Sequence, residues 1–421
     1  MKVFIAMLIA TSSAIASVPS VSAWKHCTRT PVSDVPERHT IHSYFNVCPE
    51  SPDGRYVVFY ASKTPSSETG EIILRNRETG KEETIATNIE TEDAHRAACQ
   101  QWMQGGKTVV YHNHSKGVWT VYAYDVETKQ TRTLATERQL GFTSPDGKGN
   151  LVPLYGYHWN PTKHRDFEVY DLNENKIRTV VTINDAIDAI KSLNPEWLET
   201  TFTGNKDKMS IFFPVMSPGD KYVFFKISQG SGKDNFKSGA ASKREGKVVY
   251  DTTGKFLRFL PQWGHPSWSP DAQEILEKGN FTVNIFTKKG RHLTRFSTDH
   301  PSFGPDGTLF VSDGKATKAD YVATGKQVVT VGDAVEKDGK SVRIDYFVST
   351  KGARSWRKSH PHPVFNFDGT RIYYNVCEGE WTELRVAEID PDAPETPEWI
   401  LSNLPEFKGD TTCAYVSFSV Y

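Results

Sequence analysis

A short turn motif recurs along this chain, and each copy is followed by a run of β-forming residues. It reads Ser-Pro-Asp-Gly at Ser51–Gly54 and at Ser144–Gly147, and takes related forms elsewhere. Pro fixes φ for the turn, Asp accepts hydrogen bonds from the turn's own backbone, and Gly adopts the positive φ before the strand resumes. Seven copies lie about 35 to 73 residues apart, and they begin at Ser51, Gln104, Ser144, Ser217, Ser269, Pro305 and Phe367.

One such turn marks any hairpin, but seven copies with this spacing are typical of propeller blades. The sequence therefore predicts an all-β fold, a seven-bladed β-propeller of four-stranded antiparallel blades, and one domain over residues 24–421. The helical pattern at Asn184–Leu193 is expected to be an insertion in the longest interval. A propeller closes when strands from both ends of the chain share a blade, and Ala414–Tyr421 is a candidate closing strand.

The first 23 residues have the pattern of a secretory signal peptide. Lys2 precedes an apolar run from Val3 to Ala10, and small residues then offer cleavage after Ala16 or Ala23. No stretch reaches the roughly 20 apolar residues that a membrane span requires. The protein is expected to be secreted, extracellular and monomeric, without a membrane partner.

Charge and cysteine content limit the partners and the cross-links. Net charge is −1 with no basic block, so a nucleic-acid partner is not expected, and an anionic substrate would be held by a few placed cations. Five cysteines leave the disulfide pairing open. Cys27–Cys48 is a natural local pair and Cys377–Cys413 could fasten the C-terminal end, which leaves Cys99 as a buried thiol.

Three strands that lead into the turns begin with His-Pro. The histidines are His265, His300 and the pair His360 and His362 in His-Pro-His-Pro. Such strands line a propeller's central channel, and neutral imidazoles that converge there form a divalent-metal site. A single His-Pro can simply shape the start of a strand while its ring packs. The set together favours a metal or a polar substrate floor.

A second group of polar residues lies nearer the N-terminus. His95 begins one strand, and the next strand ends in His112 and His114, so a hairpin would bring His95 and one of these to the same rim. Tyr155 and Tyr157 share a strand face because they are two residues apart, and Arg165 follows. Two histidines, a tyrosine and an arginine suit β-elimination from a uronic acid: a cation stabilises the carboxylate, a base takes the C5 proton and an acid protonates the leaving oxygen. The tyrosines alone are equally typical of ordinary strand aromatics.

These residues resemble the seven-bladed propeller polysaccharide lyases, which include oligogalacturonate lyases, ulvan lyases and, most closely, L-rhamnose-α-1,4-D-glucuronate lyases. The resemblance rests on the His-Arg-Ala-Ala-Cys-Gln-Gln-Trp segment at His95, on His114, on Tyr-Gly at Tyr155, and on the His-Pro repeats. It implies catalytic roles for His95, His114, Tyr155 or Tyr157, and Arg165. It also implies metal binding in the channel, and we assign the predicted ligands to His265, His300, His360 and His362.

Two further predictions concern the residues that contact the substrate and the identity of the metal ion. We assign substrate contacts to His42, Arg96, Gln101 and Asn113. The resemblance favours Ca²⁺, whereas all-imidazole ligation suits Zn²⁺ or Mn²⁺ better. In oligogalacturonate lyases a Gln three residues before His-Pro-His-Pro completes a manganese site, and Arg357 stands at that position here.

The expected activity is β-elimination at a terminal L-rhamnose-α-1,4-D-glucuronate linkage of arabinogalactan or gum arabic, which would release rhamnose and a Δ4,5-unsaturated glucuronate. His114 is the expected proton-transfer residue, with Tyr155 or Tyr157 as its partner, while His95 and Arg165 hold the carboxylate. The alternatives are an α-L-rhamnosidase on the same linkage, an ulvan or oligogalacturonate lyase, and a non-catalytic glycan-binding propeller.

Overall fold

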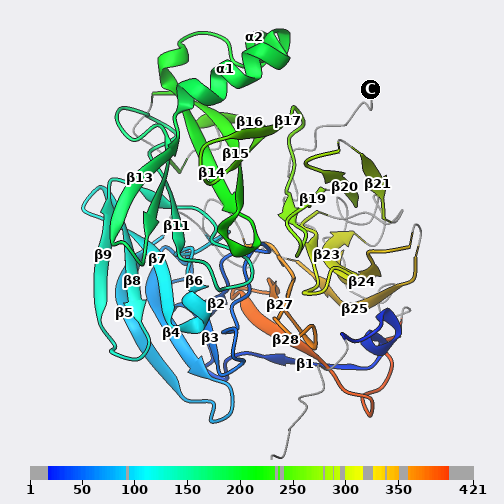
Figure 1. Cartoon of the computed structure of the whole chain (residues 1–421). Coiled ribbons are helices and arrows are strands. Elements are labelled where there is room, and N and C mark those ends of the chain that lie inside the picture. Colours follow the sequence, from blue (N-terminus) through cyan, green and yellow to red (C-terminus); the bar gives the residue numbers. More distant parts are fainter. Residues whose placement is uncertain are drawn as a thin grey trace, which may run out of the picture.

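Seven four-stranded antiparallel sheets follow one another around a central axis in a computed structural model of the chain (Figure 1). The structure describes residues 18–91, 94–232, 236–237, 241–277, 280–287, 289–293, 299–315, 326–336, 339–349 and 359–397. The predicted fold class, an all-β seven-bladed propeller with four-stranded blades, is confirmed. We number the sheets blade 1 to blade 7 from the N-terminus.

The first four blades are regular in their order along the chain. Blade 1 contains β2 (His39–Ile41), β3 (Tyr56–Ser62), β4 (Thr69–Asn76) and β5 (Glu82–Glu90). Blade 2 contains β6 (Gln101–Met103), β7 (Thr108–Ser115), β8 (Val118–Asp125) and β9 (Thr131–Thr136). Blade 3 contains β10 (Gln139–Leu140), β11 (Leu151–Tyr155), β12 (Phe167–Asp171) and β13 (Lys176–Val181). Blade 4 contains β14 (Met209–Met216), β15 (Tyr222–Gly230), β16 (Ser242–Asp251) and β17 (Phe256–Leu260).

The last three blades begin with very short strands, and the final one is shared between the two ends of the domain. Blade 5 contains β18 (Ser267–Trp268), β19 (Glu274–Glu277), β20 (Phe281–Asn284) and β21 (Gly290–His292). Blade 6 contains β22 (Ser302–Phe303), β23 (Leu309–Lys315), β24 (Lys326–Asp333) and β25 (Ser341–Val348). Blade 7 contains β26 (Val364–Phe365), β27 (Arg371–Val376), β28 (Glu383–Ile389) and β1 (Cys27–Pro31).

The first strand of each blade is the inner one. All residues of β2 and β6 are buried, whereas in the fourth strand β5 only Ile89 is buried and the other residues are partly or fully exposed. This burial gradient follows from the geometry, because inner strands are surrounded by the other blades and outer strands face water. Residues just before or after an inner strand are therefore held near the axis.

The turn motif folds as its chemistry predicts. At Ser51–Gly54 the Asp53 carboxylate accepts a hydrogen bond from the Ser51 hydroxyl at 2.6 Å and another from the backbone N–H of Arg55 at 3.1 Å. Gly54 has φ of 74°, in the left-handed region that a side chain would disfavour. Each such turn joins the inner strand of a blade to its second strand.

Two helices extend from the outside of the propeller, between blades 3 and 4 (Figure 1). The predicted helix is α1 (Ile183–Leu193), which begins with a capping box between Thr182 and Asp185, and α2 (Pro195–Thr201) follows at once. Their apolar faces join the core of these two blades through Ile183, Ile190 and Leu198. Neither helix, nor any other in the described part of the chain, is sufficiently long and apolar to cross a bilayer.

Strands from both ends of the domain share blade 7, as expected, whereas one expected disulfide does not form. The fourth position of blade 7 is filled by β1, paired to β28 from Cys27↔Ile389 to Pro31↔Arg385, while Ala414–Tyr421 lies outside the described residues. Cys27 and Cys48 are both buried free thiols, so the expected local disulfide is wrong: Cys27 packs in the core between blades 6 and 7, and Cys48 packs in the core between blades 7 and 1. Cys99 is a buried thiol, as expected, and Cys413 is not among the described residues.

Candidate functional site

Six histidines lie where inner strands begin or end. Each comes from a segment beside an inner strand of blades 1, 2, 5, 6 or 7, which is why residues far apart in sequence meet at the axis. We call them the axial histidine group: His42, His95, His265, His300, His360 and His362. Their side chains are largely buried, and His42, His300 and His362 are fully so.

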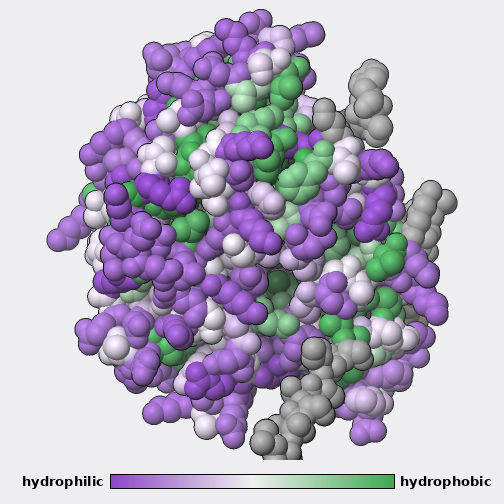
Figure 2. All heavy atoms as spheres, viewed as in Figure 1, coloured by the Kyte–Doolittle hydropathy of each residue, from purple (hydrophilic) through white to green (hydrophobic). Residues whose placement is uncertain are grey.

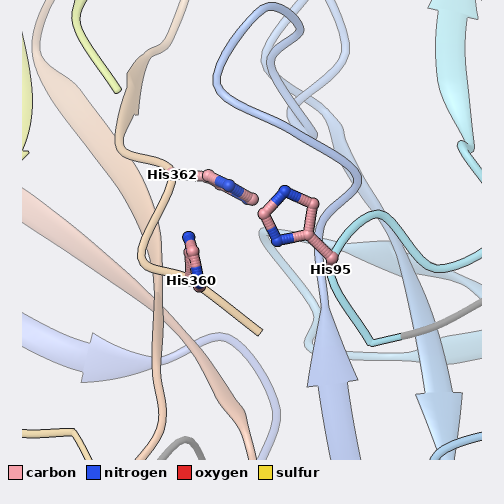
Figure 3. Close-up of side chains that lie close together, drawn as sticks. All are labelled: His95, His360 and His362. Atoms are coloured by element: carbon pink, nitrogen blue, oxygen red, sulfur yellow. The ribbon is translucent and has the colours of Figure 1, made fainter. Parts of the chain in front are cut away.

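Ring distances show how closely the group is packed. The His95 ring centroid lies 4.6 Å from those of both His360 and His362. Figure 3 shows these three rings pointing toward one another, His360 and His362 from one segment and His95 from another. Their possible ligand atoms all lie within 4.8 Å of one another, so these three residues could hold a metal ion. His300 lies 4.4 Å from His362 on one side and 4.4 Å from His265 on the other.

Burial keeps three of these imidazoles neutral, those of His42, His265 and His362. It lowers the pKa of His42 to about 4. Burial, together with the nearby His300, lowers the pKa of His265 to about 3 and that of His362 well below its usual value. Neutral imidazole is the form that binds metal. His265 is therefore uncharged near neutral pH, and its 3.6 Å approach to Asp299 is not an ion pair.

A cavity of about 290 Å³ opens beside this group. Tyr44 and His265 belong to its wall and also to the ring contacts of the axial group, since Tyr44 lies 4.4 Å from His362. We call it the cationic cavity because four basic residues and one acidic residue line it. Its walls are Tyr44, Arg96, Phe212, Phe213, Lys226, Ser242, Lys243, Arg244, Glu245, Trp263 and His265. On the face seen in Figure 2 the surface is mostly hydrophilic, and hydrophobic residues show in a hollow near its centre.

Three of the four cations of the cavity lie against aromatic rings. Lys226 lies 4.6 Å from the Trp263 ring centroid and donates to the Gly264 carbonyl at 2.8 Å. Arg244 lies 5.2 Å over Phe212, and Arg96 lies 5.7 Å over Phe213. Such contacts fix the direction of a long side chain before any ligand binds. The arrangement suits an anion with an apolar ring face, which is the chemistry of an acidic sugar.

No family model and no curated protein matches the sequence. An oligogalacturonate lyase in complex with manganese is 15% identical, with a TM-score of 0.59 over 87% of this chain and 94% of that one. An oligogalacturonate lyase from Vibrio parahaemolyticus is 12% identical, with a TM-score of 0.59 over 87% and 98%. This chain shares the fold of these lyases. The Cps50 (Swd1) β-propeller domain of Myceliophteria thermophila, at 8% identity and a TM-score of 0.51 over 86% and 100%, shares it too, so the likeness establishes the fold alone.

The structure brings most of the predicted channel residues together. The predicted ligands His265, His300, His360 and His362 all belong to the axial histidine group. His95, predicted as catalytic, lies among them rather than apart. Of the predicted substrate contacts, Arg96 lines the cationic cavity, and His42 lies 6.5 Å from His362 behind it.

The predicted catalytic residues His114 and Tyr157, from blades 2 and 3, have contacts outside the axial histidine group. His114 packs 4.9 Å from the Trp119 ring and 5.1 Å from Phe236, and its Nδ1 lies 3.7 Å from Glu90. The Tyr157 hydroxyl accepts the backbone N–H of Trp119 at 3.1 Å. His114 and Tyr157 therefore share an aromatic cluster around Trp119, which is distinct from the aromatic and imidazole contacts of His95.

Three more predicted residues are engaged by the backbone. Arg165 donates to the carbonyls of Met209 at 2.7 Å and Lys206 at 3.3 Å, and so ties blade 3 to blade 4. The buried Gln101 donates to the Cys99 and Gly141 carbonyls and accepts from the N–H of Thr143. The Asn113 side chain bonds the backbone of Glu90 and Asn88. These contacts give all three a structural role, and their expected substrate contacts or catalytic roles stay predictions.

Tyr155 is fully buried, 5.7 Å from Phe212, so it lies behind a wall of the cationic cavity and not in it. Arg357, at the position of the family's Gln, lies outside the described residues.

Nine of the eleven residues that line the cavity were not predicted from the sequence, and four of them show which signals were available. Tyr44 and Trp263 each stand two residues from a histidine of the axial group, and that proximity is a usable signal. Lys226 interrupts the apolar strand Val223–Ile227, which is unusual for a core strand. Arg244 carries no such signal.

Proposed function

We propose that this protein is a metal-dependent polysaccharide lyase that cleaves beside a uronic acid. The observation that carries the proposal is the cationic cavity. Two residues of its wall also belong to the ring contacts of the axial histidine group: Tyr44 contacts His362, and His265 contacts His300. Four basic side chains around one small cavity are the few placed cations that an acidic sugar requires in a chain of net charge −1. The shared fold with oligogalacturonate lyases agrees with this proposal.

The cations act first on the substrate carboxylate. Arg96, Lys226 and Arg244 would neutralise it, which lowers the energy of the carbanion-like state that forms when the C5 proton leaves. β-Elimination then breaks the C5–H and C4–O bonds and forms the C4=C5 double bond. The proton from C5 passes to a protein base, and the leaving oxygen takes up a proton.

Tyr44 is our candidate for proton transfer. It lines the cavity and its ring lies 5.5 Å from His95 as well as 4.4 Å from His362, so it stands between substrate space and the buried imidazoles. It replaces the earlier pairing of His114 with Tyr155 or Tyr157, because those residues pack elsewhere. A positioned group of this kind contributes about 10²–10⁴-fold.

His95, His360 and His362 are the residues that would hold a divalent ion. When bound, such an ion acts as a Lewis acid on a carboxylate or hydroxyl oxygen. Imidazole donors suit Mn²⁺ or Zn²⁺, whereas Ca²⁺ prefers oxygen ligands, so the donor set favours the former over Ca²⁺. One structurally similar oligogalacturonate lyase is in complex with manganese, which agrees with this preference.

For the substrate we propose a glucuronate capped by L-rhamnose on an arabinogalactan or gum-arabic glycan, cleaved by a secreted monomer. The support is the resemblance of the sequence to rhamnose–glucuronate lyases and its N-terminal signal pattern. The aromatic residues Phe213 and Trp263 in the cavity wall suit the apolar face of a sugar ring.

The rhamnosidase alternative requires different side chains. Hydrolysis of a glycosidic bond usually uses two carboxylates across the bond. Among the described residues that line the cationic cavity, Glu245 is the only carboxylate. This composition favours elimination.

The test is to incubate the full mature chain with gum arabic and to follow both the absorption of unsaturated uronate and free rhamnose. We expect one unsaturated uronate for each rhamnose released. Rhamnose without the chromophore would establish hydrolysis and overturn the lyase proposal. Chromophore from oligogalacturonate or ulvan, with none from gum arabic, would keep the lyase and replace the substrate. Binding without turnover on any of the three would leave a glycan-binding propeller.

A further inference from the structure

A second cluster of possible metal ligands lies beside the first. His265 stands just before β18 in blade 5, and Asp299 and His300 stand just before β22 in blade 6. Their possible ligand atoms lie within 4.8 Å of one another, and none of the three belongs to the group formed by His95, His360 and His362. Two imidazoles and one carboxylate form a ligand set that binds Fe²⁺, Mn²⁺ or Zn²⁺ with coordination positions left open.

The orientation of His300 is fixed as in known metal sites. Its Nδ1 donates to the Asp313 carboxylate at 2.9 Å, and its backbone N–H donates to the same carboxylate at 2.9 Å. Metal-bound histidines commonly donate their second ring N–H to a carboxylate, which sets the tautomer and turns the other nitrogen to the ion. His300 would therefore ligate through Nε2, which is buried.

His265 and Asp299 approach each other at a distance that suits a shared metal ion. The His265 Nδ1 and the Asp299 Oδ1 are 3.6 Å apart, slightly beyond hydrogen-bond length. A carboxylate and an imidazole nitrogen at this distance can be joined by an ion between them. Asp299 and Asp313 also supply two negative charges, which would balance a divalent cation in a largely buried place.

We propose that His265, Asp299 and His300 bind a second divalent metal ion, next to the ion held by His95, His360 and His362. This ion would face the cationic cavity, because His265 lines it and the side chains of His265 and Asp299 keep 13% and 23% of their surface exposed. A substrate carboxylate or hydroxyl oxygen would be its external ligand. The role in turnover rests on the proposed function, whereas the binding of the ion does not.

The test is a count of metal per chain. The full mature chain is stripped with a chelator, reconstituted with Mn²⁺ alone, passed through gel filtration and assayed by mass spectrometry of the metal. We expect two Mn²⁺ per chain in the wild type. Asp299→Asn and His265→Ala should each retain one, His95→Ala should also retain one, and His95→Ala/His265→Ala should retain none. His292→Ala, on the exposed end of β21 in the same blade as His265, is the matched control and should retain two.

Two results would overturn the proposal. A wild type with one ion that both His95→Ala and Asp299→Asn abolish would mean a single site. A wild type with one ion that Asp299→Asn leaves in place would mean that the second cluster binds none. Melting curves of each variant exclude loss of metal through unfolding. Two bound ions without any lyase activity would keep this inference and overturn the proposed function, and lyase activity with one ion would do the reverse.

Discussion

The axial histidine group and the aromatic cluster around Trp119 contain similar residues, but the contacts of these residues differ. In the axial group His95 faces other imidazoles, 4.6 Å from His360 and from His362. In the aromatic cluster His114 packs against Trp119 and Phe236, and Tyr157 accepts a backbone N–H. Arg165, in the same part of blades 3 and 4, is held by two carbonyls.

The difference follows from position in the blade. His95 lies just before an inner strand, where seven blades converge, so its neighbours come from other blades. His114 lies near the end of the second strand, where its neighbours are the adjacent strand β8 and a loop. For these two histidines, residue type alone therefore does not identify the candidate for the site, and a position beside an inner strand is the better guide.

The largest effect should come from Tyr44→Phe. If Tyr44 transfers the proton, turnover on gum arabic should fall by at least about 10²-fold, with substrate binding and melting temperature close to wild type. His114→Ala should lower turnover by less than about threefold, because a partly exposed side chain outside the cavity contributes little. Initial rates of chromophore formation measure both.

The opposite result for the two variants would contradict the assignment of proton transfer to Tyr44. An inactive His114→Ala beside an active Tyr44→Phe would return proton transfer to the aromatic cluster around Trp119. Both variants should be checked for binding by calorimetry, so that a loss of rate is separated from a loss of affinity.

The second test compares two arginines. Arg244→Ala removes a cation from the cavity wall and should raise KM for the glycan by about tenfold, since a hydrogen bond to a charged group is worth about 1.5–3 kcal/mol. Arg165→Ala removes two bonds to backbone carbonyls and should lower stability by about 1–2 kcal/mol with little change in KM. Denaturant melts and steady-state kinetics on both variants give the split. A raised KM for Arg165→Ala with unchanged stability would restore its predicted role at the carboxylate.

The fold could be predicted because the repeat is local. Each turn at Ser51, Ser144 or Ser269 is encoded by adjacent residues, and the hydrogen bond from Ser to Asp forms within three positions. The closing strand could not be predicted in this way. The pairing of β1 with β28 joins residues more than 350 positions apart, and it depends on which end of the chain reaches blade 7.

The site was predictable where a motif marks the inner strand and not elsewhere. His-Pro at His265, His300 and His360 marks the start of such strands, so their convergence followed from the blade count. The cations Lys226 and Arg244 come from β15 and β16, the second and third strands of blade 4, and they meet the other cavity residues only through tertiary packing, which no local motif encodes. Gln101 shows a further difficulty: a buried polar side chain in a strand can hydrogen-bond the backbone of the next blade as readily as a ligand.

The smallest effect is expected at Asp220, which extends the comparison to a carboxylate used by the backbone, as Arg165 is. It lies in the turn before β15, and its Oδ2 accepts the N–H groups of Asn150 at 2.6 Å and Leu151 at 3.0 Å. Burial raises its pKa from 3.8 to about 6. Because the folded state holds this proton more tightly than the unfolded state, the stabilisation is complete below a pH of about 3.8 and is lost as the pH rises through about 6.

Asp220→Asn cannot ionise and its amide oxygen can accept the same two bonds. As the pH rises from about 4 to about 7, the free energy of unfolding of Asp220→Asn should therefore increase relative to that of the wild type by about 1 kcal/mol, after allowance for partial exposure. Melts of both proteins across this range measure the difference. A constant difference, or a change in activity without a change in stability, would show that Asp220 does not act as a structural carboxylate between blades 3 and 4.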